Sequence, residues 1–270
     1  MDYRTLIEGA KSRVSIRDSL FRQQRLAVDD PSPRKCIWTT GRAGKSTAVL
    51  TEFTADAVER DYSGYFYFCL TEKQVFKIAW PILRYLDRTY KLNARFQQHL
   101  ALVTYPNGSW IQLAGADRPV ALDRFYGIKL RGAAFDEAGF YSSLDLRDMI
   151  EDTIGPRLVD DDGQCYIMSI PPRYPFGLFF DVIKKFPKRE NMAGVLSPTE
   201  PEWSVHSWTT HDNPAMKDKF AAEIARKKAN DPDYNKKSAY IRNYEGNNIF
   251  DMSFIKKADA SNHFIWNIFF

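Results

Sequence analysis

The feature that most constrains this fold is a glycine-containing loop set between two apolar stretches. The loop is Thr39-Thr40-Gly41-Arg42-Ala43-Gly44-Lys45-Ser46-Thr47; it follows Cys36-Ile37-Trp38 and precedes Ala48-Val49-Leu50-Thr51-Glu52-Phe53. This order predicts a strand, a phosphate-binding loop and a helix. Backbone N–H groups of such a loop surround a phosphate, its lysine reaches the β- and γ-phosphates, and its serine hydroxyl binds Mg²⁺. We therefore predict a nucleotide site formed by Thr40, Gly41, Arg42, Ala43, Gly44, Lys45, Ser46 and Thr47.

The loop departs from the pattern G-x-x-x-x-G-K-[ST] at its first position, where Thr39 stands in place of glycine. We expect Gly41 to carry the tight turn instead. An ordinary strand-to-helix turn would have a similar sequence, so the loop needs support from a second motif.

That second motif is a short strand of small and apolar residues that ends in two acids, Gly132-Ala133-Ala134-Phe135-Asp136-Glu137. Most Asp-Glu pairs are solvated turns or helix starts. Here an apolar strand delivers the pair to a sheet edge. We predict that Asp136 holds Mg²⁺ and that Glu137 is the general base for the attacking water.

Composition places the chain among globular proteins with a large core. It has 270 residues, of which 44% are hydrophobic and 14% aromatic, and no segment reaches the length of a membrane span. Its three cysteines lie in apolar runs without metal or redox spacing, which predicts buried thiols. The net charge is +4, with the basic excess in residues 1 to 45. This excess fits either an arm that binds phosphates or a solvated amphipathic helix.

Two further polar residues are candidates for the nucleotide site. Gln24, with Gln23 as its rival, precedes the loop, and a glutamine amide there can pair with the adenine edge, although glutamine is also common on exposed helices. Ser169 ends an apolar strand, at the edge where α/β sheets bind ligands. We predict that it couples phosphate loss to motion, and the alternative is a serine that caps a turn.

The remaining pattern predicts alternating strands and helices, and hence a mostly parallel sheet. We expect helices over 5 to 27, 72 to 88 with Thr71 as N-cap, 144 to 154 and 216 to 229. We expect strands over 65 to 70 and 164 to 170, and a hairpin of 100 to 105 with 110 to 113 that decorates the sheet.

The order of these motifs resembles the large terminase subunit of tailed bacteriophages, the motor that packs DNA into procapsids. The resemblance spans nearly the whole chain. Besides the loop and Phe135-Asp136-Glu137-Ala138, it rests on Asn107-Gly108-Ser109, Gly115-Ala116-Asp117, Ile154-Gly155-Pro156-Arg157-Leu158, Ser169-Ile170-Pro171, Asp212-Asn213-Pro214 and Tyr244-Glu245-Gly246.

The resemblance implies an α/β P-loop NTPase of the additional-strand, catalytic-glutamate class with a RecA-like sheet, using ATP and Mg²⁺. It implies that Arg42 stabilises transition-state charge. Where the family has a hydroxyl residue, this chain has Ile170, so any role of that hydroxyl is lost. Arg124 and Arg131 are the candidates for an arginine finger that acts on a neighbouring subunit.

Three regions are expected from the resemblance. Residues 1 to 173 are an ATPase core with a helical N-terminal arm, 174 to 246 a small linker subdomain with remaining core elements, and 247 to 270 a tail toward a missing domain or partner. The tail is apolar, which fits either an interface or packing on this domain's own core. No acid cluster of a nuclease follows the ATPase motifs, so we expect that activity to be on another chain, removed, or absent.

The implied partners are double-stranded DNA, a portal protein that carries a homo-oligomeric ring of this chain, and the small terminase subunit, in the host cytoplasm and away from membranes. Two other functions stay open. A helicase-like ATPase should have a second RecA-like domain, and a module that binds nucleotide without hydrolysis should lack Glu137.

Overall fold

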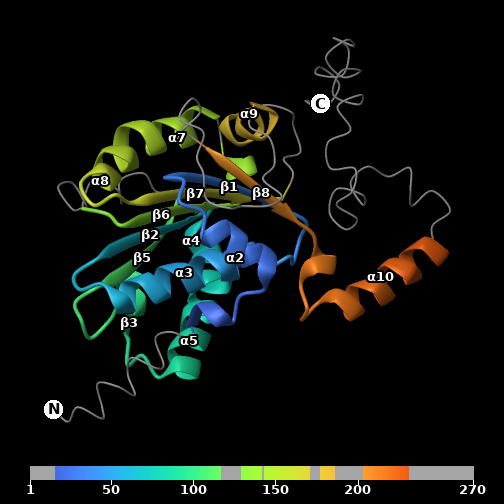
Figure 1. Ribbon diagram of the computed structural model, residues 1–270, viewed down its shortest axis with the longest axis horizontal. Helices are drawn as coiled ribbons and strands as arrows, with labels where there is room; N and C mark the ends of the chain where they lie inside the picture. The colour runs from blue at the N-terminus through green and yellow to red at the C-terminus, as the bar shows by residue number, and fades with distance from the viewer. Residues whose placement is uncertain (1–15, 117–128, 142, 171–176, 186–202, 231–270) are drawn as a thin grey trace.

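The computed structural model describes residues 16–116, 129–141, 143–170, 177–185 and 203–230. Within them the chain forms one eight-stranded sheet in the order β3-β4-β5-β2-β6-β7-β1-β8 (Figure 1). The strands are β1 Arg34–Thr39, β2 Gly64–Cys69, β3 Arg95–Gln97, β4 Leu102–Thr104, β5 Trp110–Gly115, β6 Gly132–Asp136, β7 Gln164–Ser169 and β8 Ser204–Trp208. Pairing is parallel from β5 to β8 and antiparallel among β3, β4 and β5. The predicted, mostly parallel α/β sheet is confirmed.

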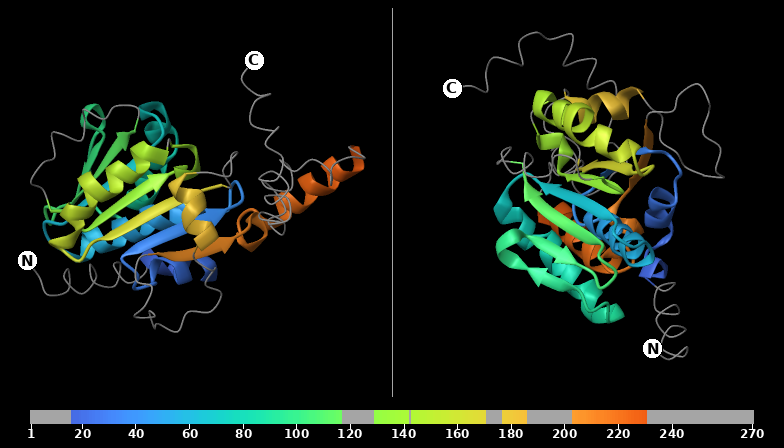
Figure 2. Two further views of the ribbon diagram at one scale, coloured as in Figure 1. Left: turned by 90° about the horizontal axis from the view of Figure 1, so that it is seen from above. Right: turned by 90° about the vertical axis from the view of Figure 1, so that its left-hand side faces the viewer.

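Helices cover both faces of this sheet (Figures 1 and 2). One face carries α2 Arg22–Val28, α3 Lys45–Glu59, α4 Glu72–Lys77 and α5 Ala79–Tyr90. The other carries α7 Ser143–Asp148, a π-helical stretch Met149–Ile154, α8 Gly155–Val159 and α9 Leu178–Lys185. Short 3₁₀ turns span Gln98–Leu100, Ala138–Phe140 (η2) and Thr210–Asp212 (η4), and α10 spans Lys217–Asn230. None of the helices in the described ranges has the length and apolarity needed to cross a bilayer.

The core has two halves, because alternate residues of each central strand point to opposite faces. Every residue of β2 is buried. Tyr65 and Tyr67 pack with α3 and α5, whereas Phe66 and Phe68 pack with β6 and the helices of the other face. Gly132 opens β6 because a Cβ there would lie 2.7 Å from the ring of Phe53. This glycine lets α3 lie close on the sheet.

Two predicted helices are interrupted in the structure. The helix expected over 5 to 27 is broken at Phe21, whose extended backbone precedes the first turn of α2; its first residues lie outside the described ranges. The helix expected over 72 to 88 ends at Lys77, and α5 starts again at Ala79. Pro81 explains the second break, since its ring would clash with the carbonyl of residue 77 in a continuous helix. Thr71 is the predicted N-cap and accepts from the backbone of Gln74.

The predicted hairpin is present, but it does more than decorate the sheet. Its second strand, β5, pairs along its full length with β2 and so belongs to the sheet itself. The predicted strands at 65 to 70 and 164 to 170 and the helices at 144 to 154 and 216 to 229 are present as β2, β7, α7 with its π-helical extension, and α10.

The parallel strands all end at one edge of the sheet. Trp38 lies beside Ser169 in the pairing of β1 with β7, and Asp136 beside Met168 in that of β6 with β7. The ends of β1, β6 and β7 therefore meet where the loop starts. From the same edge α10 extends away from the body of the molecule (Figure 2, left).

Candidate functional site

The loop between β1 and α3 owes its shape to two left-handed residues. Arg42 has φ 61° and Gly44 has φ 88°. Gly41 does not have a positive φ, and a Cβ on it would meet nothing within 4 Å. The prediction that Gly41 carries the tight turn is therefore wrong. Gly44 is the position that needs glycine, because a Cβ there would also lie 2.8 Å from the side-chain nitrogen of Gln24.

The start of α3 suits an anion. Gly44 is the N-cap and supplies no side-chain cap to the first turn. The first N–H groups of a helix lack intrahelical acceptors and carry a partial positive charge. A phosphate held by the loop would satisfy them.

Asp136 lies at the end of β6 with both oxygens engaged. Its Oδ2 accepts from the Ser46 hydroxyl at 2.8 Å and from the Tyr67 hydroxyl at 2.7 Å, and its Oδ1 accepts from the backbone of Glu137 at 3.0 Å. The residue is only 1% exposed. Sequence reasoning missed Tyr67, since its place depends on the pairing of β2 with β6.

Glu137 has a left-handed backbone, with φ 56°, directly after β6. Its Oε1 lies 2.8 Å from Nζ of Lys45, and its Oε2 accepts from the Ser169 hydroxyl at 3.4 Å. A residue other than glycine is strained in this backbone conformation, and such strain clusters at functional sites. The turn aims the carboxylate back at the loop.

Lys45 is shared by the two acids, with Nζ 3.7 Å from Asp136 and 2.8 Å from Glu137. Burial alone would lower the pKa of this ammonium, but the two carboxylates outweigh burial and the pKa is raised. Burial and the charge of Asp136 raise the pKa of Tyr67 well above its ordinary value, so its hydroxyl stays a donor. The fold therefore brings Lys45, Ser46, Asp136, Glu137 and Ser169 together.

The protein oxygens present fit Mg²⁺. Among the described residues no group of three or more His, Cys, Asp or Glu side chains forms a metal cage. Mg²⁺ in nucleotide sites keeps several waters and takes one or two protein ligands together with phosphates. The Ser46 hydroxyl and Asp136, hydrogen-bonded at 2.8 Å, supply such a pair.

The other predicted loop residues fall into two groups. Thr40 and Ala43 are buried, whereas the side chains of Arg42 and Thr47 are exposed. The hydroxyl of Thr40 lies 2.7 Å from that of Thr210, so it faces the protein and only its backbone is available to a ligand.

Gln24 lies against the loop but uses both ends of its amide. Nε2 donates to the carbonyl of Gly44 at 2.8 Å, and Oε1 accepts from the backbone of Phe21. The rival Gln23 donates to Asp212. Contact with adenine stays a prediction for both glutamines.

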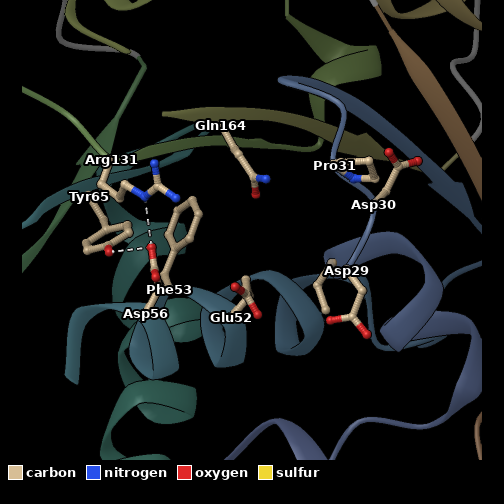
Figure 3. Close-up of a pocket in the computed structure, with 10 residues that line it drawn as sticks. Asp29, Asp30, Pro31, Glu52, Phe53, Asp56, Tyr65, Arg131 and Gln164 are labelled. Carbon is tan, nitrogen blue, oxygen red and sulfur yellow. Dashed lines mark hydrogen bonds and ion pairs between the residues drawn. The ribbon is translucent and has the colours of Figure 1, made fainter. Parts of the chain in front are cut away.

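The two candidate arginine fingers differ in outcome. Arg124 lies outside the described residues. Arg131 precedes β6, at the sheet edge opposite the loop, and Figure 3 shows it pointing with Tyr65 toward Asp56. Its guanidinium also donates to the carbonyls of Asp161 and Asp162. These contacts within its own chain argue against Arg131 as a finger.

Comparison of whole structures identifies several similar proteins. The ATPase domain of the large terminase of Thermus phage P74-26 matches at TM-score 0.60 with 17% identity, covering 84% of this chain and 93% of that domain. The large terminase of bacteriophage HK97 matches at 0.58 with 15% identity over 82% of this chain. The large terminase of a thermophilic bacteriophage, in complex with ATP-γ-S, matches at 0.54 with 14% identity over 81% of this chain. This chain covers 48% of each of the latter two proteins.

Sequence comparison adds nothing to this. No protein-family model matches the chain, and no curated protein matches it. At such low identity the likeness establishes the fold alone, which is that of phage large-terminase ATPase domains.

Proposed function

We propose that this chain is the ATP-hydrolysing motor of viral DNA packaging, the ATPase of a terminase large subunit. The observation that carries the proposal is the strained turn at Glu137, which places one carboxylate between Lys45 and Ser169 beside a phosphate-binding loop. The likeness of the whole sheet to large-terminase ATPase domains, one of them in complex with ATP-γ-S, supports the same function.

Each residue has a role that follows from its position. Backbone N–H groups of the loop and Lys45 bind the triphosphate, and Ser46 and Asp136 hold Mg²⁺, which neutralises phosphate charge when bound. Tyr67 and the backbone of Glu137 fix the orientation of Asp136. Arg42, exposed on the loop, is free to reach transition-state charge.

Glu137 is held by Lys45 in the structure, and this contact blocks it as a base. When Lys45 turns to a phosphate, the carboxylate loses its cation and accepts a proton from water. Ser169 touches the other oxygen of Glu137 and sits at the end of β7, so it is placed to sense this change. Coupling through Ser169 is part of the proposal.

The partners follow from the proposed motor. They are double-stranded DNA, a homo-oligomeric ring of this chain on a portal protein, and the small terminase subunit, in the host cytoplasm. Arg124 is the remaining candidate for a finger that completes a neighbour's site. The linker and tail boundaries proposed above and a nuclease supplied elsewhere belong to the same proposal.

Steady-state ATP hydrolysis with Mg²⁺ tests the proposal, with Glu137→Gln as the variant. Glutamine keeps the size of the side chain but cannot take a proton, so turnover should fall roughly 10²-fold or more while nucleotide binding remains. Glu151→Gln, which removes an exposed carboxylate bound to Arg34, is the matched control and should keep wild-type turnover. Equal rates for Glu137→Gln and wild type would overturn the mechanism.

Double-stranded DNA distinguishes a packaging motor from an ATPase of other purpose. DNA added to the wild-type chain should raise turnover and leave Glu137→Gln inactive. Turnover indifferent to DNA at every protein concentration would argue against translocation.

A further inference from the structure

Four successive carbonyls of the phosphate-binding loop accept hydrogen bonds from side chains outside it. The donors are Thr210 Oγ1 to Gly41 at 2.6 Å, Asn213 Nδ2 to Arg42 at 3.1 Å, Trp208 Nε1 to Ala43 at 2.8 Å and Gln24 Nε2 to Gly44 at 2.8 Å. We call these four side chains the carbonyl clamp. Because four successive carbonyls of the loop are hydrogen-bonded, the directions of the N–H groups that follow them are restricted as well.

Three members of the clamp come from one distant segment. Trp208 ends β8, Thr210 begins η4 and Asn213 is the residue after η4. β8 pairs in parallel with β1, and Trp208 lies opposite Thr39. Because of this pairing, the end of β8 and the following η4 lie beside the loop that begins where β1 ends.

The clamp determines where the N–H groups of the loop point. Across a trans peptide the C=O and the following N–H point in opposite directions. Carbonyls 41 to 44 are held outward, that of Gly44 also by the amide of Ala48 at 3.0 Å. The amide of Ala43 donates to the Thr40 carbonyl at 3.4 Å, and the amides of residues 42, 44 and 45 turn toward the interior of the loop. Converging amides of this kind form an anion-binding nest.

The clamp is rigid in its own right. Thr210 is fully buried and Trp208 is 3% exposed. Thr210 is fixed a second time, since its backbone donates to the Thr40 hydroxyl at 2.8 Å. The α2 helix braces the segment through Gln23, which donates to Asp212, and through the edge contact of Phe21 with Trp208.

We infer that Trp208, Thr210 and Asn213 are positioning residues for the triphosphate: they hold the loop's amides in place without touching the ligand. The inference rests on the proposed function, because it takes the ligand to be a nucleoside triphosphate. It predicts that removing one donor weakens nucleotide binding although no ligand contact is lost.

Thr210→Val tests this in the full chain, since valine keeps the shape and removes the hydroxyl. Its Kd for Mg²⁺·ATP-γ-S, measured by calorimetry, should rise roughly three- to tenfold, because the Gly41 carbonyl loses its donor and the Thr40 hydroxyl loses its partner. Thr210→Ser restores the hydroxyl and should restore the Kd. Amide hydrogen exchange at residues 42 to 45 should be faster in the valine variant without nucleotide.

Thr54→Val is the matched control. Thr54 is also a buried threonine. It lies in α3, away from the loop, and its hydroxyl accepts a hydrogen bond from the Tyr105 hydroxyl. This variant should lower Tm and keep the wild-type Kd. Loss of affinity in Thr54→Val equal to that in Thr210→Val would reduce the effect to general destabilisation and overturn the inference.

Trp208→Phe gives a second, independent measurement, because phenylalanine keeps the ring beside Phe21 and loses the indole N–H. It should also raise the Kd severalfold. Wild-type affinity in both Thr210→Val and Trp208→Phe, or in the second if the first fails to fold, would refute the clamp and leave the ATPase proposal intact. Failure of the wild type itself to bind Mg²⁺·ATP-γ-S would refute both.

Discussion

Gly44 and Gly41 lie in one loop, yet their backbones make different demands. Gly44 is left-handed and faces Gln24, whereas Gly41 has neither constraint. Gly44→Ala should lower the free energy of unfolding by about 1–3 kcal/mol and weaken nucleotide binding, through backbone strain and displacement of Gln24. Gly41→Ala should stay within about 0.5 kcal/mol of wild type. Urea unfolding of both variants measures this; equal losses would contradict the conformations given to the loop.

Lys35 gives a prediction for pH. It is fully buried and donates to the Val28 carbonyl, Gln164 and Tyr166 at 2.9 to 3.0 Å. Burial lowers its pKa to about 8, although the charge of Asp30 opposes this. The unfolded chain keeps this proton to about pH 10.4, so between these values it binds more protons than the folded chain, and the Lys35 contribution to stability rises with pH.

Lys35→Met removes this titration. Between about pH 7.5 and about pH 9.5, the stability of wild type relative to Lys35→Met should rise by about 2 kcal/mol. Taking the difference between the two proteins cancels the titration of cysteines and tyrosines common to both. A difference that stays constant with pH in urea unfolding would mean that Lys35 keeps an ordinary pKa in the folded protein.

Which site residues the sequence reveals depends on how local their signals are. Lys45 and Ser46 belong to the sequence motif of the loop itself. Asp136, Glu137 and Ser169 stand at the ends of apolar strands, and the parallel pairing of these strands places their ends at one edge of the sheet. Tyr67, Trp208 and Thr210 have no such signal. Their positions depend on the registers of β2 with β6 and of β8 with β1, which join segments far apart in the chain.

Among the elements, α3 is capped at its C-terminus by a residue from another segment. Nδ2 of Asn107, in the turn between β4 and β5, donates to the carbonyls of Ala57 and Arg60 at 2.8 and 2.9 Å. Asn107→Ala should cost about 1–3 kcal/mol of unfolding free energy, because the Ala57 carbonyl loses its donor, whereas the Arg60 carbonyl keeps the hydroxyl of Ser109. Nucleotide affinity should not change, since this turn lies at the edge opposite the loop.

Asn213→Ala is the contrasting variant for that experiment. Asn213 also donates to a backbone carbonyl, that of Arg42, but within the clamp. Its loss should weaken nucleotide binding more than it lowers stability. If both asparagine variants shifted the Kd alike, the separation between a structural edge and a nucleotide edge would be wrong.

Helix boundaries were harder to predict than strands. The apolar periodicity continues through Ile78, so the break before α5 has one local signal, Pro81, which fits the first turn of a new helix and clashes inside an old one. Pro156 likewise stands at the first turn of α8, after the π-helical stretch. Periodicity reports the buried face and leaves the backbone hydrogen bonds undetermined.

For the whole molecule, the sequence predicts the single βα units and the hairpin better than it predicts where the hairpin joins the sheet. Each βα unit carries its own pattern, but the pairing of β5 with β2 depends on contacts such as Trp110 against Gly64, where a Cβ would clash with the indole. The packing of one large side chain on a distant glycine has no local signature. The hairpin was therefore predictable, whereas its neighbour in the sheet was not.

The proposed ring predicts that subunits depend on one another. Arg131 is engaged within its own chain, so a site completed in trans needs a cation from elsewhere in the neighbour, with Arg124 the remaining candidate. Mixing wild type with Glu137→Gln at constant total concentration should then lower turnover more steeply than the wild-type fraction, since one inactive subunit stalls its neighbours. At dilutions that prevent assembly, the fall should become proportional. A proportional fall at every concentration, with DNA present, would show subunits that hydrolyse independently and would remove the ring from the proposal.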